Sequence, residues 1–317
     1  MASTIAGAIV EYLQLMIRNV VVNSAENFND INGGLSSELS SEYPSPQDFA
    51  ESIRLVPTSP YQYVSTIAHQ LAARSSLTPV EICQELLLST TEMEIDRSAR
   101  LEICCGYNEA GYSYFQLMPE SVMTWLNYIH DLPIDLCLDR DRVSSPIPSI
   151  DVAIYAHARC CSLLKLAETS RLVTITPNWQ ISTPELFWQS QSSCRENQLR
   201  AASGSIFNTL AEDRLIHTLM EVLDSIYSDN LQLNSRESAP KHSSGSRRHR
   251  RQPNWAKLTI DLAHSWLEFY RHCRIFGDLQ RQNPQLAIAR CMLTAIARRY
   301  LQLLLENYLG ISAAVEL

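Results

Sequence analysis

The sequence lacks the features of several large protein classes. Glycine is scarce, at 9 of 317 residues, and no apolar run approaches the roughly 18 residues that cross a bilayer. We therefore expect neither a fibrous protein nor a membrane protein. The 9 cysteines include no Cys-x-x-Cys spacing, which predicts reduced, buried thiols in a cytoplasmic protein and no metal site.

Catalytic motifs are missing as well. There is no phosphate loop ending in Gly-Lys-Ser/Thr, no dinucleotide-binding glycine fingerprint and no His-Glu-x-x-His. Gly111-Tyr112-Ser113 lacks the second glycine of a nucleophile elbow. The sequence therefore predicts a protein that is not an enzyme and that needs no cofactor.

Positive charge is scarce in the first part of the chain and accumulates in the last. Residues 1–130 hold 5 Lys/Arg against 15 Asp/Glu, whereas residues 200–317 hold 15 against 11, within a net charge of -8. If the protein binds nucleic acid, the C-terminal part must supply the attraction.

Residues 1–130 have the pattern of an α+β domain. An amphipathic helix is expected at the start, followed by a long loop over 23–59 that is rich in Ser, Asn, Glu and Pro. Ser59-Pro60 predicts the start of a helix, and Thr78-Pro79-Val80-Glu81 predicts a capping box that opens the next one. Further segments predict two adjacent strands and then a helix: 101–105, 112–117 and 119–129.

Residues 131–149 have the composition of a linker, and residues 150–317 predict an all-helical bundle. Its helix signals include the capping box Thr209-x-x-Glu212, an apolar stripe from Leu258 to Cys273, and Asn283-Pro284. Residues 233–253 predict a mobile insertion, because they cannot form a core. This insertion carries four candidate phosphate contacts, namely Arg247, Arg248, Arg250 and Arg251.

Three segments carry a family resemblance: Tyr155-Ala156-His157-Ala158-Arg159, then 262–275, then the terminal 309–317. Together they resemble the DALR-type anticodon-binding bundle of arginyl-tRNA synthetases. Residues 63–87 and 111–117 resemble the family's N-terminal appended domain, which contacts the tRNA elbow. The family's ATP-binding domain would lie between them, where this chain has only residues 131–149, too few for a domain.

The resemblance implies a mainly helical protein that binds tRNA or another structured RNA without aminoacylating it. Family members hold anticodon bases with residues that correspond here to Tyr155, Arg159, Tyr270 and Leu317. The spacing adds Arg274, because positions i and i+4 share a helix face. A ring beside a guanidinium can stack an unpaired base and hold its phosphate. His157 lies on neither stacking face, and we expect a structural role for it.

Two alternatives remain open from the sequence alone. The tyrosines can pack inside the bundle while the arginines form surface ion pairs. The chain can also be a protein-interaction or regulatory scaffold that kept the fold, with the acidic N-terminal domain as its docking surface, because a fold does not carry its function with it.

Overall fold

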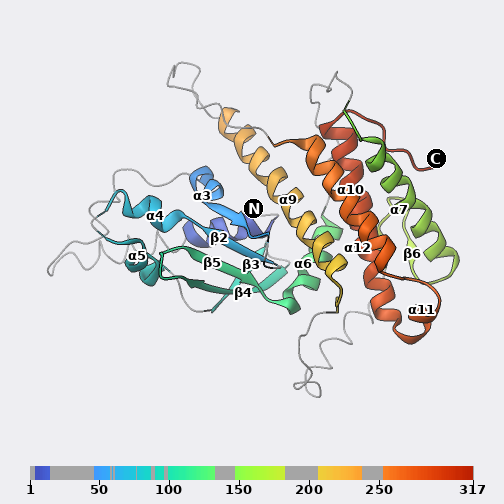
Figure 1. The fold of residues 1–317 in the computed structure, drawn as a ribbon, viewed down its shortest axis with the longest axis horizontal. Coiled ribbons are helices and arrows are strands. Elements are labelled where there is room, and N and C mark those ends of the chain that lie inside the picture. Colours follow the sequence, from blue (N-terminus) through green and yellow to red (C-terminus); the bar gives the residue numbers. More distant parts are fainter. Residues whose placement is uncertain are drawn as a thin grey trace. The chain divides into compact units, whose positions relative to one another are not determined.

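The computed structural model describes residues 4–14, 46–57, 59, 61–75, 77–86, 90–95, 99–132, 147–182, 206–237 and 253–316. These residues are mainly helical, with a small antiparallel sheet near the N-terminus followed by helices (Figure 1). They belong to two compact units, Met1–Thr124 with Met220–Pro253, and Trp125–Leu219 with Asn254–Leu317. This division differs from the expected one, because helices α6 (Pro119–Asp131) and α9 (Leu210–Glu237) each contribute to both units.

The N-terminal unit is built on a five-stranded antiparallel sheet with strand order β1-β2-β5-β4-β3. The two predicted strands are confirmed as β4 and β5, which pair with Tyr107 opposite Ser113 and Ile103 opposite Leu117. The strand bounds are Ile53–Leu55 (β1), Gln62–Ser65 (β2), Thr90–Ile95 (β3), Ala99–Tyr107 (β4) and Ser113–Leu117 (β5).

One face of this sheet is packed and the other is half-covered. Along β5, Ser113, Phe115 and Leu117 are buried while the residues between them are not, as the two-residue period of a strand requires. Phe115 meets the ring of Tyr12 edge-on, with ring centroids 6.4 Å apart, so helical residues 5–14 pack against this face.

Three short helices complete the part of this unit that precedes α6: α3 (Pro46–Ser52), α4 (Ile67–Ala72) and α5 (Pro79–Leu86). The capping box of α5 is confirmed. Thr78 N donates to Glu81 Oε2 at 2.7 Å, and Glu81 N donates to Thr78 Oγ1 at 3.3 Å. These bonds satisfy backbone donors that the first turn of a helix cannot satisfy by itself.

Two sequence expectations are wrong in this unit. Ser59-Pro60 does not begin a helix, because residues 62–65 form β2, where pairing with β1 and β5 outweighs an apolar spacing that also fits a helix. The expected loop over 23–59 contains α3 and β1 at its C-terminal end, while residues 15–45 lie outside the described part.

In the C-terminal unit, α7 (Asp151–Thr169), α10 (Trp255–His272) and α12 (Pro284–Leu303) pack side by side (Figure 1). The predicted stripe on α10 is confirmed by buried Leu262, Trp266, Phe269 and Cys273. Asn283 caps α12 as predicted, because its side chain accepts from Leu286 N at 3.1 Å. Short helix α11 (Asp278–Gln282) precedes α12, and a π-helical turn, Leu304–Tyr308, follows it.

Two expectations for this part of the chain are also wrong. The stretch after residue 149 is not all helical, because β6 (Thr174–Ile175) and β7 (Ile181–Ser182) form a small hairpin. The predicted insertion begins later than residue 233, since α9 continues to Glu237. Residues 238–252, with Arg247, Arg248, Arg250 and Arg251, lie outside the described residues.

The cysteines of the described segments have the structural role that the sequence predicts. All seven are free thiols, and all but Cys104 are buried. Burial raises the pKa of Cys105 and of Cys291 to about 12, which keeps both thiols protonated and unreactive. No helix in the described segments combines the length and the apolar character needed to span a bilayer.

Candidate nucleic-acid interface

On helix α7, exposed residues directly precede buried ones in the sequence. Ala156, Cys160 and Leu164 are fully buried, whereas Tyr155 is 46% exposed and Arg159 is exposed. Tyr155 and Arg159 lie one turn apart, so the expected helix-face geometry is confirmed for this pair. Two of the three residues between them, Ala156 and Ala158, are small and buried on the side where α7 packs against α10 and α12.

Helix α10 presents a tyrosine to this face of α7. The ring of Tyr270 stacks on the buried ring of Trp266, with centroids 5.4 Å apart and planes 15° from parallel. Arg159 Nη2 donates to Tyr270 Oη at 2.9 Å, and its Cζ lies 5.4 Å from the centre of the same ring. The hydrogen bond raises the pKa of Arg159, so the guanidinium is charged at every physiological pH.

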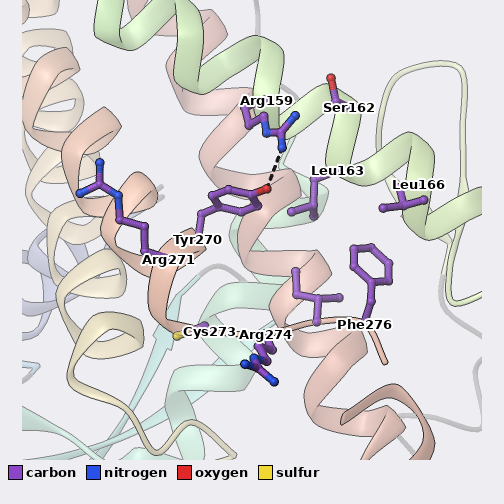
Figure 2. A pocket seen from close by; sticks show the side chains of 10 residues that line it. Arg159, Ser162, Leu163, Leu166, Tyr270, Arg271, Cys273, Arg274 and Phe276 are labelled. Carbon is purple, nitrogen blue, oxygen red and sulfur yellow. Dashed lines mark hydrogen bonds between the residues drawn. The ribbon is translucent and has the colours of Figure 1, made fainter. Parts of the chain in front are cut away.

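Arg159 and Tyr270 border a cavity of about 520 Å³. Figure 2 shows Arg159 pointing from α7 toward Tyr270, with Leu163 and Leu166 further along the same helix and Phe276 below Leu166. Three arginines line the cavity, and the described residues around it include no carboxylate. The lining residues are Arg159, Ser162, Leu163, Leu166, Tyr270, Arg271, Cys273, Arg274, Ile275 and Phe276. The site therefore combines positive charge, one aromatic ring and an apolar wall.

The structure corrects the expected geometry of Tyr270 and Arg274. They do not share a helix face, because α10 ends at His272 and Cys273 is extended, with φ -109° and ψ 97°. Arg274 still lines the cavity, from the turn after the helix, although its guanidinium points away from the Arg159–Tyr270 pair in Figure 2. Sequence spacing failed here because the helix ends at His272, two residues before Arg274.

The chain end lies along α7. His157 is buried and its Nδ1 donates to the carbonyl oxygen of Ala314 at 2.7 Å, while Lys165 Nζ lies 2.6 Å from Glu316 Oε1. Burial lowers the pKa of His157, which agrees with the structural role expected for it. Leu317 lies outside the described residues.

No family model, no curated protein and no solved structure matches this chain. The cavity and the sequence motifs are therefore the features that bear on function. Within the described residues, no three His, Cys, Asp or Glu side chains are grouped as metal ligands would be.

Several lining residues were not anticipated from the sequence. Arg271 follows Tyr270 directly, and Leu166 is 53% exposed one turn beyond Leu163. An exposed leucine in a helix next to arginines is a weak signal by itself. Phe276 could not be assigned in advance, because its position depends on the direction that the chain takes after α10.

Proposed function

We propose that this protein is a noncatalytic RNA-binding protein, and that the cavity between α7 and the end of α10 holds an unpaired nucleotide of tRNA or another structured RNA. The observation that carries the proposal is the hydrogen bond between exposed Arg159 and half-buried Tyr270 at a cavity lined by arginines and by no carboxylate among the described residues. The proposal also includes the DALR-type identity of the bundle and its relationship to arginyl-tRNA synthetases.

The chemistry of the cavity suits a splayed-out nucleotide. An aromatic ring stacks any base, and alanine substitution of such a ring costs about 1–3 kcal/mol per base. The guanidinium of Arg159 can pair with a phosphate in a fork geometry that lysine cannot reproduce. A volume of about 520 Å³ lies within the range of small-ligand sites.

The resemblance to the anticodon-binding bundle supports the same residues independently. The Tyr-Ala-His-Ala-Arg segment lies on α7, and the segment with Tyr270 lies on α10, so two motifs 111 residues apart meet in one hydrogen bond. In the alternative with both tyrosines in the core, Tyr155 would be buried, and it is 46% exposed.

Fluorescence anisotropy with labelled total tRNA, near physiological salt, tests the proposal. We expect Tyr270→Ala and Arg159→Ala each to weaken binding about tenfold, as the loss of one stacked base or one phosphate contact predicts. Arg159→Ala should also reduce the salt dependence of binding by about one phosphate contact.

Two matched variants serve as controls. Arg281→Ala removes an exposed arginine of the same unit that pairs with Asp278, and Tyr107→Ala removes a tyrosine that is 36% exposed in the other unit. Both should bind as the unchanged protein does. Equal affinity for all four variants, or a partner captured from lysate that survives RNase treatment while tRNA does not bind, would reject the RNA-binding proposal.

A further inference from the structure

A buried ion pair contacts the backbone of the turn that lines the cavity. Arg290 on α12 is 6% exposed, and its Nε donates to Glu212 Oε1 on α9 at 2.7 Å. Glu212 is completely buried. Two buried charges persist only when their remaining hydrogen-bonding positions are also satisfied, so the other contacts of this pair indicate what it holds.

The second oxygen of Glu212 is used at the start of α9. Oε2 accepts from Asn208 N at 3.0 Å, from Thr209 N at 2.9 Å and from Thr209 Oγ1 at 2.8 Å. Thr209 Oγ1 in turn lies 3.2 Å from Cys273 Sγ. The capping box of α9 is thereby joined to the first residue after α10.

The second nitrogen of Arg290 reaches the turn of the cavity itself. Nη1 donates to the backbone oxygen of Arg274 at 2.6 Å. All four residues 273–276 line the cavity, with Cys273 and Ile275 buried. The direction of the chain after α10 therefore depends on a contact that arrives from α12.

We propose that Arg290 is the positioning residue of the nucleotide cavity: by holding the carbonyl of Arg274 while paired with Glu212, it fixes the turn 273–276 and thereby sets the affinity for RNA without contacting RNA. This inference rests on the proposed function. The buried guanidinium acts on RNA binding through the backbone of Arg274 and not through its own charge.

The guanidinium of Arg290 reaches two hydrogen-bond acceptors at once. Its planar group presents separate N–H donors to Glu212 Oε1 and to the Arg274 carbonyl. Arg290→Lys keeps a positive charge beside Glu212 but has one nitrogen in place of two, so it separates the turn contact from the charge. Cys291→Ala, at the next position of α12, is the matched control, because it removes a fully buried side chain that is not an arginine and lies one residue away on the same helix.

Three measurements on the full chain test the inference. We expect Arg290→Lys to weaken tRNA binding about tenfold and Cys291→Ala to leave it within about twofold, at similar melting temperatures. In the Arg274→Ala background the backbone carbonyl of residue 274 remains, so Arg290→Lys should weaken tRNA binding further. Amide hydrogen exchange at residues 275 and 276 should accelerate in Arg290→Lys and stay unchanged in Cys291→Ala.

The outcomes separate this inference from the proposed function. Unchanged exchange at the turn, or unchanged tRNA affinity in Arg290→Lys, would overturn the positioning role even if RNA binds. Faster exchange at the turn, with tRNA affinity insensitive to Tyr270, Arg159 and Arg274, would keep the structural role of Arg290 and reject the RNA site.

Discussion

The two units contain the same local motif, a Thr-x-x-Glu capping box, in opposite surroundings. Thr78 and Glu81 open α5 in the N-terminal unit at the surface, where the box bonds only within itself. Thr209 and Glu212 open α9 in the C-terminal unit, and there Glu212 is buried and also binds Arg290.

The motif fixes the local geometry of the helix start in both units, whereas burial decides how many other contacts depend on its glutamate. The hydrogen bonds inside the two boxes are nearly the same, with the Thr N to Glu Oε2 distance at 2.7 Å in one and 2.9 Å in the other. The exposed box stabilises only the start of α5. The buried box connects a helix start, a turn and a second helix through one carboxylate.

The largest predicted difference between the two boxes comes from neutralising their glutamates, Glu212 and Glu81. Glu212→Gln retains the shape, but an amide has one acceptor where the carboxylate accepts from Arg290 on one oxygen and from Asn208 and Thr209 on the other. One buried set of donors must face an NH₂ group, and Arg290 loses its counter-charge. We expect a loss of about 3–5 kcal/mol in the free energy of unfolding, measured by urea denaturation.

Glu81→Gln is the matched control for that change. Its carboxylate is exposed, so water replaces any bond that the amide cannot make. The denaturation midpoint should stay nearly unchanged. Similar losses for the two variants would contradict the view that burial decides the weight of the motif.

The same contrast explains how much of the molecule could be predicted from sequence. Both capping boxes, strands β4 and β5 and the stripe on α10 follow from short-range spacing, and the structure confirms them. The bond between Glu212 and Arg290 spans 78 residues, and Arg290 also contacts the backbone of Arg274, two residues after the end of α10 at His272. The family resemblance and helix spacing therefore pointed to Arg159, Tyr270 and Arg274, all of which line the cavity, but not to the turn 273–276 that places Arg274 there.

A smaller effect concerns the pH dependence of stability in the N-terminal unit. Asp224 in the N-terminal unit accepts from Tyr63 Oη at 2.8 Å, and burial raises its pKa to about 7. Because the folded pKa exceeds the unfolded value of about 3.9, the native state binds more protons between these values, and stability falls as pH rises. We expect a loss of about 2 kcal/mol between pH 5 and pH 7 from this group.

Asp224→Asn isolates the contribution of Asp224 from those of other titrating groups. The difference in unfolding free energy between the unchanged protein and this variant, measured in urea at pH 5, 6 and 7, should become steadily less favourable to the aspartate. A difference independent of pH would mean that Asp224 titrates at an ordinary value in the folded protein.

The smallest predicted effect is the loss of stability when the threonine hydroxyl of each box is removed. Removing a threonine N-cap costs about 0.5–2 kcal/mol, and Thr78→Ala should lie at the low end because its helix start is open to water. Thr209→Ala should lie at the high end, since Thr209 Oγ1 also contacts Glu212 and the thiol of Cys273. Thr209→Ser keeps the hydroxyl and should recover most of the loss in urea denaturation. Equal losses at Thr78 and Thr209 would show that the cap of α9 works only within its own first turn, and the link from α9 to the cavity would then rest on Arg290 alone.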